Sequence, residues 1–544
     1  MKLKLSPKGI CGLLAIMALH SPNSEAAPVA EKSMGGVPVI YPHRHGDLTD
    51  TEKEMAKIAW RYFENNYQPE TGLVNAVENY PSTTMWDTGS YMAALVSAHK
   101  LGLIDKQTFD DRLSRLLRTL NNMSFFKNEL PNKVYHTKTA EKVNYGNKPG
   151  EIGFSGLDLG RMLVWLKIVK ELYPEHAGAI DNFVLRWDFT HVVDKCGTLF
   201  GAIVNDNKQT QYVQEGRLGY EEYSAKGFQL WNASTCLASR PEPYQTIPMY
   251  CVDVPYDTRD PRKLSQHNYV VSESYVLDGM ELGWDLTSDT TSPDNVHTDK
   301  VMENFAHRIY QVQENRHKAT GILTARSEHQ LDVAPYFVYD TIYSDGYPWN
   351  TITEAGKYVP EFAAVSLKAA LGMWALWDSP YTDLLANHIW HQYVPEKGYY
   401  EGVYENGKGP IKTFTANNNG IMLETLLFKQ FGKLLKVNQL APLYKNKPPS
   451  LWDRQLTDPF EGQNNLKGRP RVRTDVGVFG STPAKAPSKS WFGFGKNSES
   501  CVNDGSAFKG AGDNQDASKC PACSVCPVCQ DNAPVTLPAW SSCH

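Results

Sequence analysis

Two adjacent carboxylates, Glu221 and Glu222, stand between tyrosines in the segment GYEEYSAKGFQLW, residues 219–231. The rest of this segment has apolar residues at helical spacing and no obvious solvated face, so we predict a buried helix. A buried charge is costly unless it is hydrogen-bonded or serves chemistry at a site. Because adjacent helical residues point in different directions, we expect one of the two carboxylates to face a cavity.

Five further segments share this composition: they are apolar nearly all round, rich in Gly, Ala and Ser, and headed by polar or aromatic residues. Amphipathic segments with one solvated face alternate with them, starting near residues 51, 105, 175, 299 and 381. Six buried helices that alternate with amphipathic ones predict an all-α fold, an (α/α)6 toroid with an inner and an outer ring. The fourth outer helix is not visible, and residues 240–262, rich in Pro and Asp, predict an irregular insertion there. The six buried segments have their heads near residues 86, 155, 220, 272, 361 and 416.

In such a toroid the heads of the inner helices converge on a central bowl. The carboxylates at these heads give four candidates for a catalytic acid and base, namely Glu221, Glu222, Glu273 and Asp87. Two loop carboxylates, Asp345 and Glu401, are further candidates for these roles. The candidate substrate-binding residues are polar or aromatic and lie at the helix heads or in loops: Trp86, Asp158, Tyr220, Tyr223, Asp345, Trp349, Tyr400, Glu401 and Asn418.

Local structure offers another explanation for the same carboxylates. Acidic side chains in a first helical turn satisfy free backbone amides, at ~0.5–2 kcal/mol for a cap. Ser155 and Asp158 have the spacing of a capping box, and Asp87 is placed to cap its own helix. Glu222 has Lys226 four residues further on as a partner. Each carboxylate therefore has a structural explanation beside the chemical one.

Paired carboxylates in a bowl lined with aromatic rings favour glycoside cleavage. One carboxylic acid protonates the leaving oxygen, and a second carboxylate activates water or attacks carbon. Apolar surroundings raise the pKa of a carboxyl group toward the range that an acid needs, although a helix N-terminus opposes this. We therefore predict an exported carbohydrate-active protein, a glycoside hydrolase or transglycosylase. The alternative is a non-catalytic polysaccharide-binding or assembly factor that uses the same bowl.

An ordered set of short motifs runs through the toroid segment: WDTGSY, YEEYSAKGF, SESYVLDGMELGWD, PYFVYDTIYSDGYPWNT, AAVSLKAALG, GYYEG and NNNGIMLE. With these motifs, residues 49–436 resemble the bacterial exported DUF3131 family, whose function is unknown, and more remotely the glucoamylase-like (α/α)6 proteins that include β-1,2-glucanases. The resemblance implies a toroid that handles a poly- or oligosaccharide, such as a bacterial β-glucan or exopolysaccharide. It transfers no catalytic pair.

Charge and missing motifs argue against several other functions. The chain of 544 residues has a formal net charge of -5, so no strong field draws it to nucleic acid. The sequence has no HExxH motif, no Gly-x-Ser-x-Gly elbow and no GxGxxG that opens a βαβ unit. We expect no cofactor and no metal, including at His43 and His45, which precede the first helix.

The sequence divides into five parts. Residues 1–26 have the basic start, apolar stretch and small residues of a signal peptide. No later run reaches the ~18 apolar residues of a membrane span, so we expect no transmembrane anchor in the mature chain and a periplasmic or secreted location. The remaining parts are an N-terminal arm (residues 27–48), the toroid (49–440), a linker rich in Pro, Ser and Gly (441–500) and a Cys-rich tail (501–544).

The tail is predicted to be disordered and held by cross-links between its cysteines. Four thiols at three-residue spacing could hold zinc or an iron–sulfur cluster, but disulfides are the commoner outcome after export. Each bridge would contribute ~2–4 kcal/mol by constraining the unfolded chain. We predict a flexible tether that is dispensable for the toroid and offers an attachment point for a protein partner in the envelope. Its cysteines are Cys501, Cys520, Cys523, Cys526, Cys529 and Cys543.

Overall fold

The computed structural model describes residues 41–194, 196–241, 243–258, 269–289 and 296–435, and this part of the chain is mostly helical with short strands. The predicted signal peptide, the linker and the six tail cysteines lie outside the described residues. No helix in the described ranges has the length and apolar character needed to cross a membrane.

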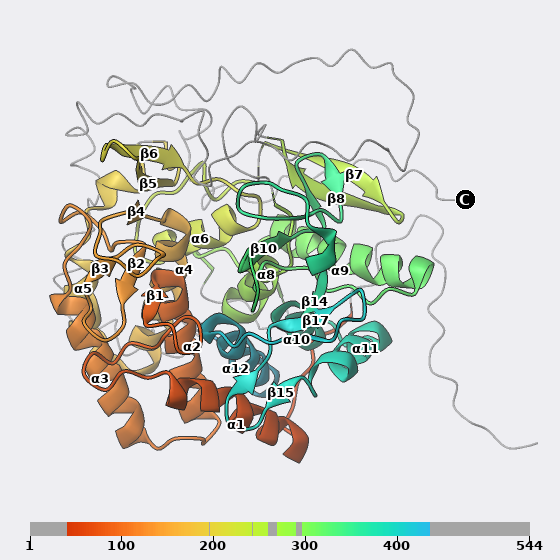
Figure 1. Cartoon of the computed structure of the whole chain (residues 1–544), viewed down its shortest axis with the longest axis horizontal. Helices are drawn as coiled ribbons and strands as arrows, with labels where there is room; N and C mark the ends of the chain where they lie inside the picture. The colour runs from red at the N-terminus through yellow and green to blue at the C-terminus, as the bar shows by residue number, and fades with distance from the viewer. Residues whose placement is uncertain (1–40, 195, 242, 259–268, 290–295, 436–544) are drawn as a thin grey trace, which may run out of the picture. The chain divides into compact units, whose positions relative to one another are not determined.

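Six helices correspond to the six segments predicted to be buried (Figure 1). They contact one another in chain order, and the last contacts the first, so the contacts form a closed cycle. Their apolar composition explains this arrangement, because a helix without a polar face must be covered on every side. The six are α2 (Met85–Lys100), α4 (Gly156–Leu172), α6 (Tyr220–Gln229), α8 (Glu273–Leu277, continued by a π-helical turn, Asp278–Leu282), α10 (Leu367–Leu376) and α12 (Ala416–Phe431).

The helices α4 and α6 cross closely in this cycle, and two glycines make this possible. A Cβ atom added to Gly227 would lie 2.1 Å from the carbonyl oxygen of Gly160. A Cβ atom added to Gly160 would lie 2.5 Å from the Cβ of Ser224. These distances are far below van der Waals contact, so only glycine permits the two backbones to approach this closely.

Five amphipathic helices pack outside this cycle, as predicted. Their apolar faces are buried against the inner helices: α1 contacts α2 and α12, α3 contacts α2, α5 contacts α4, α9 contacts α8, and α11 contacts α10. At the place of the missing outer helix, residues 244–257 form a regular antiparallel hairpin of β7 (Tyr244–Met249) and β8 (Val252–Asp257), so the prediction of an irregular insertion is wrong there. The outer helices are α1 (Asp50–Asn65), α3 (Lys106–Asn122), α5 (Ala177–Val184), α9 (Lys300–Thr320) and α11 (Pro380–Ile389).

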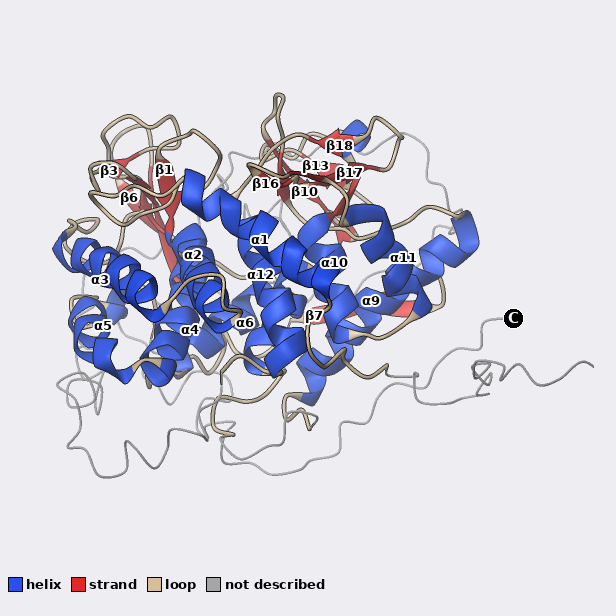
Figure 2. Ribbon diagram, turned by 90° about the horizontal axis from the view of Figure 1, so that it is seen from below, coloured by secondary structure: helices blue, strands red, loops and turns tan. Residues whose placement is uncertain are grey.

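Short antiparallel strands were not part of the all-α prediction, and they matter because several lead directly into inner helices. Figure 2 shows most of them on one side of the helices. The strand β1 (Ser82–Thr84) leads into α2, β4 (Gly153–Phe154) into α4, and β14 (Ala364–Ser366) into α10. The sheets are β1 with β2 (Val134–His136) and β3 (Lys142–Val143); β4 with β5 (Phe200–Val204) and β6 (Thr210–Gln214); β9 (His329–Gln330) with β10 (Phe337–Asp340) and β13 (Thr351–Ile352); β11 (Tyr343–Ser344) with β12 (Tyr347–Pro348); β14 with β17 (Gly402–Tyr404) and β18 (Pro410–Ile411); and β15 (Tyr393–Val394) with β16 (Gly398–Tyr399).

Candidate active site

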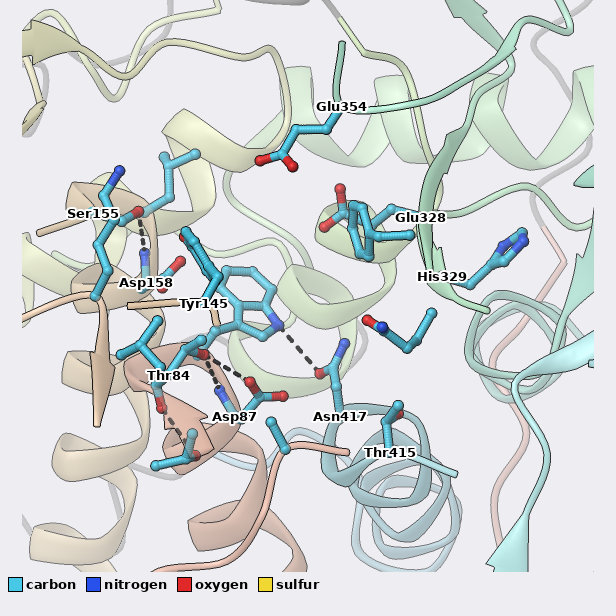
Figure 3. Close-up of a pocket in the computed structure, with 18 of the residues that line it drawn as sticks. Thr84, Asp87, Tyr145, Ser155, Asp158, Glu328, His329, Glu354, Thr415 and Asn417 are labelled. Atoms are coloured by element: carbon cyan, nitrogen blue, oxygen red, sulfur yellow. Dashed lines mark hydrogen bonds between the residues drawn. The ribbon is translucent and has the colours of Figure 1, made fainter. Parts of the chain in front are cut away.

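A cavity of about 490 Å³ opens where the inner helices begin. Five of the six inner helices contribute lining residues from their first turns, and the connecting loops and strands contribute the rest (Figure 3). The convergence of helix heads on one bowl, which the sequence predicts, is therefore observed. The lining residues from the helix heads are Trp86 and Asp87 of α2, Asp158 of α4, Tyr220 of α6, Lys368 of α10 and Asn417 of α12.

The sixth inner helix, α8, supplies Glu273, which lies directly behind this lining and has no exposed surface. Its carboxylate forms an ion pair with Lys368 and accepts hydrogen bonds from Asn417 Nδ2 at 2.7 Å and Trp86 Nε1 at 3.2 Å. Burial alone would raise the pKa of Glu273, but the charge and hydrogen bond of Lys368 hold it below the ordinary value. Glu273 is therefore ionised and fixes three of the residues that face the cavity.

Asp158 stands at the N-terminal end of α4, where Ser155 caps the helix by accepting a hydrogen bond from the Asp158 backbone N–H at 3.2 Å. The reciprocal bond of a capping box is not formed, so the Asp158 carboxyl group is available to line the cavity. Enclosure raises its pKa to about 7, the neighbouring Glu215 adds to the rise, and Lys133 opposes it. At neutral pH this group exchanges a proton readily.

Glu401 follows strand β16 and is 2% exposed. It accepts a hydrogen bond from the Thr415 hydroxyl, and the backbone N–H of Gln330 points to it at 3.4 Å. Burial raises its pKa to about 7, although Lys368 works in the opposite direction. Thr415, which donates to Glu401, lies across the close-up from Asp158 in Figure 3.

Two further carboxyl groups line the cavity with a raised pKa. Asp87, in the first turn of α2, accepts a hydrogen bond from the Thr84 hydroxyl at 2.8 Å, and burial raises its pKa. Glu328 accepts from the Tyr220 hydroxyl at 3.0 Å, and burial followed by the charge of Glu273 raises its pKa. Figure 3 shows Asp87 and Glu328 on opposite sides of the cavity.

Aromatic rings stand on two sides of the same cavity. Tyr80 is 38% and Tyr145 is 63% exposed, and the Tyr80 hydroxyl donates to the Tyr145 carbonyl at 2.8 Å. On another side, the rings of Phe337 and Tyr339 pack edge to face with centroids 5.1 Å apart. Flat apolar faces beside hydrogen-bonding groups are suited to stacking on sugar rings.

The structure brings some of the sequence-predicted site residues together and separates others. Trp86, Asp87, Asp158, Tyr220 and Glu401 line the cavity. Glu273 and Tyr223 lie directly behind it, and the Tyr223 hydroxyl donates to Glu281 at 2.5 Å while its ring packs against Trp86. Besides these two, the predicted residues that do not line the cavity are Glu221, Glu222, Asp345, Trp349, Tyr400 and Asn418.

The two adjacent glutamates of α6 have local roles. Glu222 accepts a hydrogen bond from the backbone N–H of Gly219 at 2.6 Å, which satisfies the start of its own helix. Glu221 accepts from Gln214 Nε2 at 3.0 Å and is 4% exposed. Lys226, considered above as a partner of Glu222, instead forms ion pairs with Asp278 at 2.8 Å and Asp299 at 2.9 Å.

The four remaining residues lie in loops or at the start of α12. Asp345 occupies the turn between β11 and β12 with φ 52°. The Trp349 ring packs under the Arg316 guanidinium, 4.5 Å from its carbon. The Tyr400 ring lies 4.8 Å from that of Phe414, and Asn418 Nδ2 donates to the Tyr400 carbonyl at 2.9 Å.

Several cavity residues escaped the sequence analysis because they lie on loops and short strands. Lys368 had a usable signal, the polar Ser366 before an apolar run, but the helix head was placed near residue 361 instead. Glu361 lies on a 3₁₀ turn (Pro360–Phe362) and is exposed. The missed lining residues that carry charge are Lys133, Glu215, Arg217, Glu328, Glu354 and Lys368.

Among the described residues, Asp110, Glu175 and His176 form a cluster near the surface whose ligand atoms are close enough together to hold a metal ion. Lys106 Nζ already donates to Asp110 at 2.6 Å and to Glu175 at 2.7 Å. The amine thus occupies the position that a cation would take, and the carboxylates are explained by an ion-pair cluster.

The fold is similar to that of solved structures described as "putative glucoamylase". A "putative glucoamylase" from Bacteroides caccae superimposes with a TM-score of 0.54 at 10% sequence identity, covering 72% of this chain and 96% of that one. One from Bacteroides fragilis gives a TM-score of 0.54 at 11% identity, covering 74% and 96%. An endo-β-1,2-glucanase from Chitinophaga pinensis, solved with sophorotriose and glucose, gives 0.49 at 14% identity, covering 73% and 96%.

The chain belongs to the DUF3131 family, a protein family of unknown function whose sequence pattern matches residues 54–432. This confirms the resemblance drawn from the motifs. No protein of established function matches the chain by sequence. At 10–11% identity the two Bacteroides structures show a shared fold and nothing more.

Proposed function

We propose that this protein is a glycoside hydrolase or transglycosylase that acts on a poly- or oligosaccharide in the cavity, and that its helices form a complete (α/α)6 toroid. The observation that carries the proposal is the pair Asp158 and Glu401. These are two enclosed carboxyl groups on different elements of one cavity, each with a pKa raised to about 7. A group with such a pKa can give or take a proton at physiological pH.

Glycoside cleavage requires one carboxylic acid and one carboxylate on either side of the scissile bond. In the productive form, one member of the pair Asp158 and Glu401 carries the proton and gives it to the leaving oxygen. The other is ionised and activates a water molecule or attacks the anomeric carbon. Glu273 acts as a positioning residue, because its carboxylate holds Trp86 and Lys368 in the cavity wall.

The names of the structural neighbours and the features of the sequence support the remaining parts of the proposal. The two Bacteroides proteins are each described as a "putative glucoamylase", and we extend the hydrolysis of glycosidic bonds that this name implies to the present cavity. The sequence resemblance favours a bacterial β-glucan or exopolysaccharide as the substrate. The predicted signal peptide favours the periplasm or the cell exterior as the location of the reaction.

The dependence of activity on pH tests the carboxyl pair directly. The acid must be protonated, so kcat/KM falls as the pH rises above about 7. The base must be ionised, so kcat/KM also falls as the pH drops below about 7. We expect a narrow bell-shaped profile on whichever glycan of a β-glucan and exopolysaccharide panel is cleaved, with product measured by chromatography.

The variants Asp158→Asn and Glu401→Gln should each lower turnover by ~10²–10⁴ while the protein stays folded. The acid variant should keep activity on aryl glycosides whose leaving group departs without a proton. Asp206→Asn, at an exposed position, is the matched control. Unchanged turnover in both cavity variants would remove the pair from the mechanism, and glycan binding without any product would favour the polysaccharide-binding alternative.

A further inference from the structure

Two cationic side chains line the cavity without a counter-ion in contact among the described residues. Lys133, just before β2, is 8% exposed, and its side chain has no hydrogen bond or ion pair with any described residue. Arg217, in the loop between β6 and α6, likewise has no hydrogen bond or ion pair from its guanidinium within the described part of the chain. Both residues therefore line the cavity with N–H donors for which no described residue is an acceptor.

Buried arginines elsewhere in the described part of the chain, such as Arg161 and Arg326, are paired with carboxylates. Arg161 lies 2.9 Å from Glu281 and 2.8 Å from Glu424, and Arg326 lies 2.9 Å from Glu405. An enclosed cation without a contacting anion is unfavourable, because it loses hydration and gains no partner. An anion that enters the cavity would supply the partner that the protein does not.

Arg217 is also held in a fixed orientation before any ligand arrives. Its guanidinium carbon lies 5.1 Å from the centroid of the Tyr220 ring and 5.3 Å from that of Tyr269. The two rings pack against the guanidinium and restrict its rotation. Its edge, which carries the N–H donors, stays free to form hydrogen bonds. A planar fork of this kind matches the two oxygens of a carboxylate or phosphate group.

The nearest acidic groups do not account for the two cations. Glu328 directs an oxygen to the Tyr220 hydroxyl at 3.0 Å and makes no ion pair with Arg217. Asp158, the acidic group whose pKa Lys133 influences, makes no ion pair with Lys133 either. The acids that surround Arg217 and Lys133 thus leave the donors of both side chains available.

We infer that the cavity binds a glycan that carries an anionic group, and that Arg217 and Lys133 contact this group. The inference rests on the proposed function, since it names the substrate class of the same cavity. A uronic acid carboxylate and a sugar phosphate share the required chemistry, and the experiment below separates them. Neutral glycans of the same backbone lack the partner that these two cations require.

Binding to matched pairs of glycans tests the inference. The probes are oligogalacturonate and its methyl ester, phosphorylated mannan oligosaccharides and their dephosphorylated form, and neutral β-glucan oligosaccharides. Calorimetry on the full chain should show the charged member of one pair binding about tenfold more tightly than its neutral counterpart. The difference should shrink as salt is raised from 50 to 500 mM, on the order expected for screened charges. If the galacturonate pair shows the difference, the recognised group is a carboxylate, and if the mannan pair shows it, the group is a phosphate.

Substitutions assign the effect to the two side chains. Arg217→Met and Lys133→Met should each weaken binding of the charged glycan by about tenfold and leave the neutral one unchanged. Arg217→Lys keeps the positive charge but loses the planar guanidinium. It should therefore weaken binding of the charged glycan less than Arg217→Met does. Arg118→Met and Lys148→Met remove a charge from exposed positions outside the cavity and are the matched controls. Circular dichroism confirms that each variant is folded.

The outcomes separate this inference from the proposed function. Equal binding of charged and neutral members, an equal effect of Arg217→Met on both, or no binding of any charged glycan would overturn the inference. Efficient cleavage of a neutral glycan without preference for its charged form would also overturn it and leave the hydrolase proposal intact. Selective binding of a charged glycan with no bond cleaved would contradict the hydrolase proposal and support the inference.

Discussion

Glu273 illustrates at the residue scale how a buried charge can serve the site without entering it. Its carboxylate is enclosed, yet the ion pair with Lys368 keeps it ionised. Replacing Glu273 by Gln would leave the Lys368 ammonium buried without this partner, and breaking a buried pair from one side costs ~3–5 kcal/mol. We expect Glu273→Gln to lower the free energy of unfolding by about that amount in urea titrations.

The double variant Glu273→Gln with Lys368→Met provides the control for this prediction. It removes both charges, so it should regain part of the lost stability. Glycan turnover should stay low, because the cavity loses the Lys368 ammonium and the neutral Gln oxygen is a weaker acceptor for Trp86 and Asn417 than the carboxylate. A double variant less stable than the single one would show that the ion pair is not the source of the loss.

Glu222 provides a second test at this scale, since the sequence placed it among the catalytic candidates and the structure places it at the start of its own helix. Glu222→Ala leaves the Gly219 N–H without its acceptor, so the free energy of unfolding should fall by ~1–3 kcal/mol. Turnover per folded molecule should stay within about a factor of two, far from the ~10²-fold loss of a missing acid or base. A large loss of turnover at unchanged stability would return Glu222 to the mechanism.

The sequence located most of the site residues that begin an inner helix, and the loop residue Glu401, but it missed Lys368 at the start of α10 and most of the site residues on strands and loops. Trp86, Asp87 and Tyr220 head long apolar segments, and the end of such a segment is visible in the sequence. Arg217 and Lys133 reach the cavity only because short strands fold over the helix heads. The position of such strands depends on tertiary contacts, which no local pattern records.

At the element scale, helical periodicity was sufficient to find the inner and outer helices, and strand length explains the errors. The strands have two to six residues, too few for alternation to be distinguished from a helical pattern. The segment that begins at Pro360 contains a 3₁₀ turn and β14 before α10 starts at Leu367. Because the segment is continuously apolar, the sequence pattern did not distinguish the 3₁₀ turn, β14 and α10 from a single helix. The start of the helix was therefore predicted near residue 361 instead of at Leu367.

The crossing of α4 and α6 gives a prediction for whole elements. In Gly227→Ala the new methyl group would overlap the Gly160 carbonyl, so the two helices would have to move apart. Because these helices carry Asp158 and Tyr220, we expect lower stability by ~1–3 kcal/mol and a lower kcat together. Differential scanning calorimetry and kinetics on the same preparation would measure both.

Gly178→Ala in α5 is the matched control for this substitution. A Cβ at Gly178 meets no atom within 4 Å, and Ala is the better helix former. This variant should be more stable by ~0.4–1 kcal/mol with unchanged kinetics. If both glycine variants behaved alike, intrinsic helix propensity rather than the close crossing would explain the result.

At the scale of the whole molecule, one buried cluster connects most of the inner helices beneath the cavity. Arg161 of α4 contacts Glu281 beyond α8 at 2.9 Å and Glu424 of α12 at 2.8 Å. The same guanidinium donates to Ser90 of α2 at 3.3 Å and to Tyr223 of α6 at 3.2 Å. The guanidinium carbon of Arg161 also lies 5.0 Å from the centroid of the Trp86 ring, so this cluster packs against a residue that lines the cavity.

Arg161→Met would therefore disturb several inner helices at once rather than one of them. It leaves Glu281 and Glu424 buried without their cation, which should lower the free energy of unfolding by ~3–5 kcal/mol. Hydrogen exchange should accelerate in α2, α6 and α12 as well as in α4, because all of them lose a contact to the same side chain. The triple variant Arg161→Met, Glu281→Gln, Glu424→Gln removes the stranded charges and should recover part of the stability. Faster exchange confined to α4 would show that the cluster is a local contact, and the cooperative role assigned to it would be wrong.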